Sequence, residues 1–282
     1  MSSKNKRVIA IFTDVHSLVE PLEAILDDIK QRGIKEIYSL GDNIGVGPNP
    51  NEVMDLLRKH RVKSVAGNAE YYATIGVAPF MNYFTDVKIA SRDWTNSMLS
   101  DENMELIKKF PSTIELRIGK KKIALCHFTS DTRIDFILHS TWLYQDEIKY
   151  GDSPYQLFEY TNSEEQKKDI LRNINNPKPF YDGFRSASKD PLFKGKSPFK
   201  YDYVFQGHVH FKSIVKSPTT TFYTVGMAYC KKNIATYIIL YEKEDGFDIE
   251  EVYVNFDREK MLDRVKESSI PDKFLINKYL RI

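Results

Sequence analysis

The chain has 282 residues, and its 41 Lys and Arg against 39 Asp and Glu give a net charge of +2 at pH 7. Hydrophobic residues make up 41% and charged residues 28% of the sequence, which excludes collagen-like, mucin-like and wholly disordered chains. The balanced charge argues against a polyelectrolyte-binding protein, so a nucleic-acid partner is not expected. A chain of this length can bury a core without disulfides.

The cysteine content and the start of the sequence bear on the cellular compartment. Only two cysteines occur, Cys126 and Cys230, which is too few for a disulfide framework and favours a reducing compartment. The segment Met1–Arg7 is polar, and no run of about 18 apolar residues occurs anywhere. We therefore expect a cytoplasmic protein with no membrane partner.

The first third of the chain alternates strand and helix patterns. Short β-branched or apolar runs at Val8–Thr13, Ile34–Leu40 and Val62–Ala66 predict buried strands. Between them, Leu18–Gly33 carries an apolar stripe at helical spacing, and Asn51–His60 predicts a second helix with its first residue as the cap. This order predicts a parallel sheet with right-handed crossovers.

The rest of the chain predicts helices over 69–110 and then a hairpin that turns at Gly119. Strands are expected at Thr113–Ile118, Lys122–His127, Tyr203–Gln206, Lys212–Lys216, Thr221–Val225, Ala235–Glu242 and Phe247–Asn255. Residues 129–200 are rich in Tyr, Phe, Asn and Lys with poor periodicity, which indicates a cap insertion. The whole is predicted to be a single α/β domain over 1–282, layered around mixed sheets.

Polar side chains follow nearly every predicted strand. They are Asp14, His16, Asp42, Asn68, His127, His208 and His210. Because the carboxyl ends of strands in an open α/β sheet form the ligand crevice, we expect these side chains to gather at one edge. In extended backbone, residues two apart project to the same face, so Asp14 and His16 can bind one ion, and His208 and His210 can both point into the same space.

The chemistry of these side chains predicts a transition-metal site. Carboxylate, imidazole and amide oxygen suit Mn, Fe, Co, Ni or Zn better than Mg or Ca. Seven ligands are too many for one ion, but they suit two ions about 4 Å apart that share a carboxylate. The glycines before three of the motifs, Gly41, Gly67 and Gly207, permit sharp exits and close backbone approach.

The order of the motifs resembles the calcineurin-like metallophosphoesterase superfamily. The motifs are Asp14-Val15-His16, Gly41-Asp42, Gly67-Asn68, His127 and Gly207-His208-Val209-His210. The loop 41–50, GDNIGVGPNP, is similar to that of small bacterial and archaeal members, which include phosphodiesterases and dinucleoside-polyphosphate hydrolases. The resemblance implies a four-layer α/β/β/α sandwich, with the cap inserted at 129–200.

The resemblance also implies roles for the candidate ligands. The first metal ion would be held by Asp14, His16, Asp42 and His210. The second would be held by Asp42, Asn68, His127 and His208, so that Asp42 bridges the two. The ions would be Mn, Fe or both, with Co, Ni or Zn as alternatives. A metal-bridging hydroxide would attack phosphorus in line, and no side chain would act as the nucleophile.

Several positions leave alternatives open. Many relatives carry a histidine where this chain has Ala69, and a methyl group cannot donate a proton to a leaving group. His139 in the cap could replace that acid or be structural. Asn43 is a candidate substrate contact or a support for its turn. Arg133 is a candidate phosphate clamp or a surface ion-pair partner.

The sequence thus predicts a binuclear metal-dependent phosphohydrolase. Its expected substrate is a small, nucleotide-like phosphorylated molecule: a phosphodiester, or a nucleoside or dinucleoside polyphosphate such as diadenosine tetraphosphate. Hydrolysis of diesters and anhydrides with good leaving groups depends less on protonation by a general acid. The alternatives are a Ser/Thr phosphoprotein phosphatase and, in another class, an inert scaffold that has kept the fold.

Overall fold

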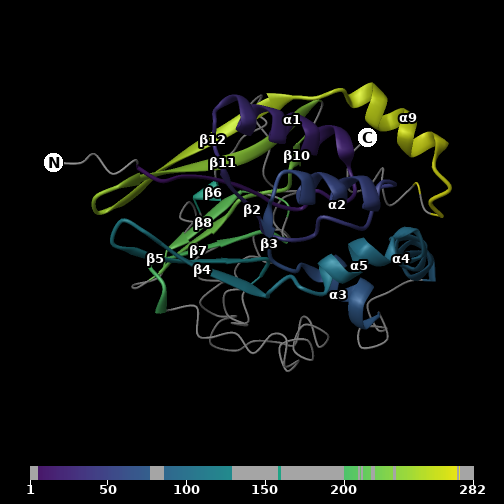
Figure 1. Ribbon diagram of the computed structural model, residues 1–282, viewed down its shortest axis with the longest axis horizontal. Helices are drawn as coiled ribbons and strands as arrows, with labels where there is room; N and C mark the ends of the chain where they lie inside the picture. Colours follow the sequence, from purple (N-terminus) through teal and green to yellow (C-terminus); the bar gives the residue numbers. More distant parts are fainter. Residues whose placement is uncertain are drawn as a thin grey trace, which may run out of the picture.

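The computed structural model describes residues 6–76, 86–128, 158–159, 200–208, 210, 212–216, 220–230, 233–271 and 273. They form a mixed α/β fold in which two β-sheets pack together with helices around them (Figure 1). This architecture agrees with the expected four-layer α/β/β/α sandwich. Apart from 158–159 and residue 200, the cap insertion at 129–200 lies outside the described residues.

Sheet A contains the parallel strands predicted in the first third of the chain. Its strands are β1 (Val8–Phe12), β2 (Glu36–Ser39), β3 (Lys63–Ser64), β10 (Tyr229–Cys230), β11 (Ile234–Lys243) and β12 (Gly246–Asn255). Strand β2 lies between β1 and β3 and runs parallel to both, whereas β1 pairs antiparallel with β11. Strand β11 also pairs with β12 and β10. The sheet therefore joins the first residues of the fold to its last strands.

Sheet B comes from the middle of the chain. Its strands are β4 (Thr113–Ile118), β5 (Lys121–Cys126), β6 (Phe158–Glu159), β7 (Tyr203–Gln206), β8 (Ser213–Lys216) and β9 (Thr221–Thr224). Their order is β4-β5-β7-β9-β8-β6. The predicted hairpin is present as β4 and β5, with Gly119 at positive φ in its turn. Strands β5, β7 and β9 are parallel, so their carboxyl ends meet at one edge.

The helices occupy two regions of the molecule. They are α1 (Val19–Gln31), α2 (Pro50–Lys59), α3 (Asn68–Ile75), α4 (Asp86–Met98), α5 (Asp101–Ile107) and α9 (Arg258–Glu267). Helices α1 and α2 pack on sheet A, and α3, α4 and α5 lie together at one end of the molecule (Figure 1). Within the described part of the chain, no helix is long and apolar enough to cross a membrane.

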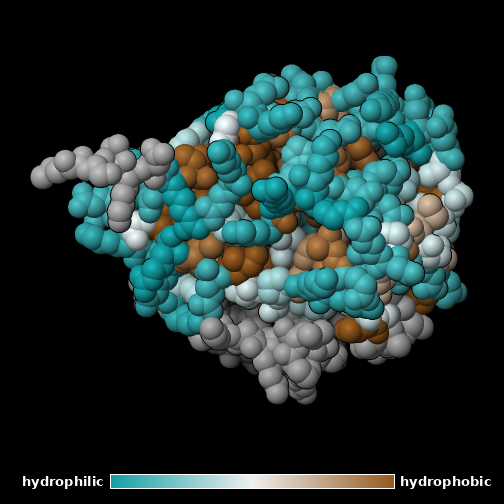
Figure 2. All heavy atoms as spheres, in the orientation of Figure 1, coloured by the Kyte–Doolittle hydropathy of each residue, from teal (hydrophilic) through white to brown (hydrophobic). Residues whose placement is uncertain are grey.

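Strand β1 shows how the layers are held together. Ala10 and Phe12 pack against the apolar stripe of α1, whereas Ile9 and Ile11 face the other way, into the core between the two sheets. All four side chains are fully buried, because successive residues of a strand point to opposite faces and both faces of β1 are covered. On the face shown in Figure 2, hydrophilic residues surround patches of hydrophobic residues.

The start of α2 differs from its prediction. The helix begins at Pro50, which suits the first helical position because its missing N–H would have no partner there. Asn51 is therefore inside the helix and does not cap it. Its Oδ1 instead accepts a hydrogen bond from the backbone N–H of Ser100 at 2.9 Å, and its Nδ2 donates to the carbonyl oxygen of Met98. Asn51 thus ties α2 to the connection between α4 and α5.

Candidate metal centre

All seven predicted ligands are among the described residues, and the structure brings them together. Asp14 and His16 follow β1, Asp42 follows β2, Asn68 begins α3, His127 follows β5, and the two remaining histidines follow β7. Two groups of three side chains each offer ligand atoms that lie within 4.8 Å of one another. The groups are Asp14, His16 and His210, and Asp14, Asp42 and His127.

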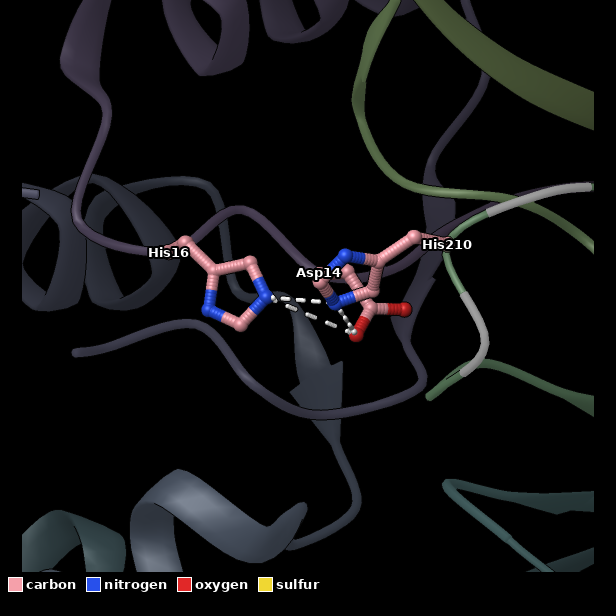
Figure 3. Close-up of side chains that lie close together, drawn as sticks. All are labelled: Asp14, His16 and His210. Atoms are coloured by element: carbon pink, nitrogen blue, oxygen red, sulfur yellow. Dashed lines mark hydrogen bonds and ion pairs between the residues drawn. The ribbon is translucent and has the colours of Figure 1, made fainter. Parts of the chain in front are cut away.

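The first group joins the end of β1 to the loop after β7 (Figure 3). The Nε2 atoms of His16 and His210 lie 2.9 Å apart. Asp14 Oδ1 lies 3.4 Å from His210 Nε2 and 3.8 Å from His16 Nε2. Figure 3 shows both imidazole rings pointing toward this carboxylate oxygen. Two imidazoles and one carboxylate aimed at a common point form a ligand set for a transition metal.

Asp14 uses its two oxygens differently. Oδ2 accepts hydrogen bonds from the hydroxyl of Thr13 at 2.8 Å and from the backbone N–H of His208 at 3.0 Å. Oδ1 is buried and accepts no hydrogen bond of good geometry from the described residues. A buried carboxylate oxygen without a donor is costly, and a bound cation would compensate for it. The arrangement around Asp14 therefore fits a metal ion.

The second group joins residues that follow strands of both sheets. His127 Nδ1 is 2.8 Å from the carbonyl oxygen of Leu40, an acceptor, so the donor of this bond is Nδ1–H. This fixes the tautomer and leaves Nε2 facing Asp42 Oδ2 at 3.4 Å. The amide oxygen of Asn68 lies 3.1 Å from His127 Nε2 and 2.9 Å from His208 Nδ1. The four side chains expected at the second ion are thus neighbours.

The two groups of close ligand atoms share one carboxylate. Asp14 belongs to both groups of close ligand atoms, whereas Asp42 belongs only to the group with His127. The predicted bridging role of Asp42 therefore stays a prediction. Each group therefore contains at least one carboxylate, and the second group contains two.

The backbone of the candidate ligands is unusual. Five of them have positive φ, between 51° and 71°: Asp14, His16, Asp42, His208 and His210. Left-handed backbone is uncommon for residues other than glycine and is concentrated at functional sites, where the surrounding structure maintains it. The sheet ends are therefore shaped to present these side chains, at a conformational cost.

Two glycines allow the segments to approach one another as predicted. A Cβ atom at Gly207 would lie 2.1 Å from Thr13 Oγ1 and 2.6 Å from Asp14 Oδ2. A Cβ atom at Gly67 would lie 2.3 Å from Asp42 Oδ1. Each distance is far below van der Waals contact, so only glycine fits at these positions.

The histidines of the two groups have opposite electrostatic environments. Burial, reinforced by the neighbouring His210, lowers the pKa of His16 to about 4, so its ring is neutral near pH 7. Burial also opposes charge on His127, but the carboxylates of Asp42 and Asp14 outweigh it and raise the pKa of His127 to about 9. The strong negative potential around His127 is the field that would favour a bound cation.

Comparison with known proteins identifies the family. Residues 8–153, about half of the chain, match the model of the calcineurin-like phosphoesterase superfamily domain. The chain belongs to this superfamily. The match covers the first four motifs, up to His127, and the structure adds the fifth motif beside them. Metallophosphoesterases of this superfamily use divalent metal ions, in agreement with the two groups of candidate ligands.

One relative and two solved structures extend the comparison. Over 122 residues, the chain is 39% identical to uncharacterised protein MJ0912 of Methanocaldococcus jannaschii; this covers 43% of the chain and about half, 49%, of that relative. The fold of the present chain is similar to that of hypothetical protein PH1004 of Pyrococcus horikoshii (TM-score 0.64, 16% identity, 97% of each chain covered). It is also similar to a metallophosphoesterase of Sphaerobacter thermophilus (TM-score 0.59, 17% identity, 97% of this chain and 98% of that one).

Three predicted site residues have different outcomes. Asn43 is fully buried, and its side chain bonds Ser39 and Ser64, at 2.5 Å and 2.9 Å. These contacts favour its alternative, the support of the turn after β2, and the role of substrate contact stays a prediction. Arg133 and His139 lie outside the described residues.

Ala69 occupies the position where many superfamily relatives carry histidine. It lies in the first turn of α3, and its backbone N–H donates to Asp42 Oδ1 at 2.7 Å. Residue 69 thus adjoins the candidate metal centre through its backbone, and its methyl side chain carries no proton to donate. The backbone of residue 69 contributes to the site even though its side chain offers no acid.

Glu70 is a site residue to which the sequence reasoning gave no role. Its side chain is buried and bonds the backbone N–H groups of Asp42, Asn43 and Gly67 at 2.7–2.9 Å. Burial, followed by the negative charge of Asp42, raises the pKa of Glu70. The signal for it was present in the sequence, since an acidic residue three positions after a helix cap commonly reaches back to the cap.

Proposed function

We propose that this protein is a binuclear metal-dependent phosphohydrolase that cleaves phosphodiesters or nucleoside and dinucleoside polyphosphates. The observation that carries the proposal is the buried Asp14 Oδ1, which lacks a good hydrogen-bond donor among the described residues and faces His16 and His210. A second group of ligand atoms lies next to it and shares Asp14. Bound cations would compensate for the buried negative charge of this site.

Different residues are proposed as ligands of the two ions. His16 and His210 would supply imidazole nitrogens to the first ion, together with Asp14. The second ion would be held by Asp42, Asn68, His127 and His208. Mn and Fe fit this mixture of oxygen and nitrogen donors, and Co, Ni or Zn are alternatives. Two bound ions would activate water at neutral pH and stabilise the charge that builds on the phosphoryl oxygens.

The substrate class follows from what surrounds the ions. Ala69 cannot protonate a leaving group, so esters with strongly basic leaving groups are poor candidates. Polyphosphates, and phosphodiesters with good leaving groups, release less basic groups, and nucleotides combine such a bond with a negative charge that the ions would attract. A small nucleotide-like molecule is therefore the proposed substrate. A phosphoserine residue of a protein is the weaker candidate, because its leaving alkoxide needs a proton.

The experiment compares substrates and metals on the purified protein. Metal ions are removed by chelation, and Mn, Fe, Co, Ni, Zn or Mg is then restored in turn. Hydrolysis of bis-p-nitrophenyl phosphate, diadenosine tetraphosphate, phenyl phosphate and a phosphoserine peptide is measured. We expect activity on the first two with Mn or Fe, and little on the last two.

Two variants attribute the activity to the candidate site. His210→Gln removes a ligand of the first group and is expected to lower kcat by about a hundredfold or more, as loss of metal-dependent charge stabilisation implies. His60→Gln is the matched control, since His60 lies at the C-terminal end of α2, where it caps the helix. Failure to cleave either favoured substrate with any of the metals would reject the proposal. Faster turnover of the phosphopeptide would favour a protein phosphatase instead.

A further inference from the structure

Glu70 lies at the junction of two segments that carry candidate ligands. Its residue exposure is 1%. Oε2 accepts the backbone N–H groups of Asp42 at 2.9 Å and Gly67 at 2.7 Å. Oε1 accepts the backbone N–H of Asn43 at 2.8 Å and its side-chain amide at 3.2 Å. Each oxygen of the carboxylate therefore receives two donors, and the four donors come from the loop after β2 and the start of α3.

These contacts fix Asp42 relative to the first turn of α3. The backbone N–H of Ala69 donates to Asp42 Oδ1 at 2.7 Å, and the absence of a Cβ atom at Gly67 lets the two segments touch. Asp42 Oδ2 is left facing His127, at 3.4 Å. Asn68, the first residue of α3, is held by the same turn, with its amide oxygen directed at His127.

The first group of ligands is positioned by other contacts. Asp14 is oriented by the hydroxyl of Thr13 and by the backbone N–H of His208. The backbone N–H of His16 donates to the carbonyl oxygen of Asp42 at 2.9 Å, which links the loops but not through Glu70. Loss of the Glu70 carboxylate should therefore disturb the two groups unequally.

We propose that Glu70 is a positioning residue for the second metal ion, because its carboxylate locks Asp42 and Asn68 into one rigid unit. This inference rests on the two-ion site of the proposed function. Glu70 acts through these ligands and is not itself a ligand. Such supporting residues commonly change metal affinity about 10- to 100-fold when they are replaced.

The variant Glu70→Gln tests the proposal. Glutamine has the same shape, but its amide group would direct its own hydrogens at two backbone N–H donors. We expect Mn²⁺ titration by calorimetry to show the second ion bound about 10- to 100-fold more weakly, with the first ion bound nearly as in the wild-type protein. The electron paramagnetic resonance spectrum should change from that of a coupled Mn pair to that of an isolated Mn ion.

Two further variants separate positioning from fold stability and from charge. Glu20→Gln is the matched control: Glu20 is also buried, and it pairs with Arg264 at 2.7 Å away from the candidate ligands. It should lower the unfolding temperature but leave both ions bound. Glu70→Asp keeps the negative charge but shortens the reach by one methylene, so we expect it to weaken the second ion as well.

The outcomes are distinguishable. Wild-type binding of both ions by Glu70→Gln would overturn the inference, as would an equal weakening of both ions in step with the unfolding temperature. Normal binding by Glu70→Asp would show that charge alone matters and would also overturn it. A wild-type protein that binds no pair of ions would instead overturn the proposed function, and this inference with it.

Discussion

The hydroxyl of Thr13 donates to Asp14 Oδ2 at 2.8 Å, and so determines which carboxylate oxygen remains for His16 and His210 to approach. The backbone N–H of His208 donates to the same oxygen, at 3.0 Å. With Oδ2 occupied in this way, Oδ1 is the atom directed at the two imidazoles. A residue that touches no candidate ion thereby sets the direction of a ligand.

Replacing Thr13 with valine keeps the shape of the side chain and removes the hydroxyl. We expect Thr13→Val to weaken binding of the first Mn²⁺ ion about 10- to 100-fold, because a hydrogen bond to a charged acceptor contributes about 1.5–3 kcal/mol. Calorimetric titration measures the effect. Thr13→Ser keeps the donor and should retain most of the affinity. Equal affinities of the valine and wild-type proteins would contradict this account of Asp14.

Gly207→Ala should damage both the fold and the metal centre. The new Cβ atom would lie 2.1 Å from Thr13 Oγ1 and 2.6 Å from Asp14 Oδ2, so the segment after β7 must move away. We expect a loss of about 1–3 kcal/mol in the free energy of unfolding, together with loss of metal binding.

Gly246→Ala serves as the control for this substitution. Its Cβ atom would meet only the flexible side chain of Lys121, at 3.3 Å. Denaturant unfolding and metal titration of the two variants make the comparison. Intact metal binding in Gly207→Ala would show that the tight packing of this glycine on Asp14 is dispensable.

Ala69→His should widen the range of substrates. An imidazole at this position, beside Asp42, could protonate basic leaving groups, and general-acid catalysis commonly contributes about 10²–10⁴-fold. We expect kcat/KM for phenyl phosphate to rise at least about tenfold relative to bis-p-nitrophenyl phosphate. Ala69→Asn has similar size but no titratable group, and should leave the ratio unchanged. If the histidine and asparagine variants had the same ratio of kcat/KM values for the two substrates, the lack of an acid at residue 69 would not limit the choice of leaving group.

The ion pair of Arg7 and Glu36 predicts a pH effect on stability away from the metal centre. The hydrogen bond from Arg7 holds the pKa of Glu36 below its ordinary value, despite the opposing effect of partial burial. The folded state therefore gains stability from this carboxylate above its unfolded pKa, and loses that gain as pH falls through the lower folded pKa.

Glu36→Gln should accordingly cost up to about 1 kcal/mol at pH 7, as expected for a part-exposed ion pair, and less at pH 3. Denaturant unfolding of both proteins at several pH values measures this difference. The exposed Glu267→Gln provides the reference. A cost that stays constant between pH 7 and pH 3 would mean that the ion pair does not stabilise the fold.

The positions of the candidate ligands could be predicted from sequence because each follows a strand with a clear apolar pattern. Val8–Phe12 is buried on both faces, so the polar residues after it had to lie at the sheet edge. The hairpin at Gly119 was equally clear, since two strand patterns flank one turn residue. Strand order within each sheet required the structure, because Ile234–Lys243 pairs with β1 across most of the chain.

The supporting contacts could not be predicted in the same way. Asn43 was an ambiguous polar residue until its burial and its bonds to Ser39 and Ser64 showed that it supports a turn. Glu70 reads as an ordinary helix-capping acid, and its contact with the N–H of Asp42 depends on two segments meeting in space. The start of α2 was misplaced because Asn51 and Pro50 both favour helix starts, and proline took the first helical position.

The hydrogen bond from the backbone of His208 to Asp14 joins residues that are 194 positions apart in the chain. During synthesis on the ribosome, Asp14 emerges long before its partner, and β11, which pairs with β1, emerges later still. The nascent chain therefore cannot assemble a complete ligand set until most of it has been translated. We therefore expect metal loading to follow the association of the two sheets.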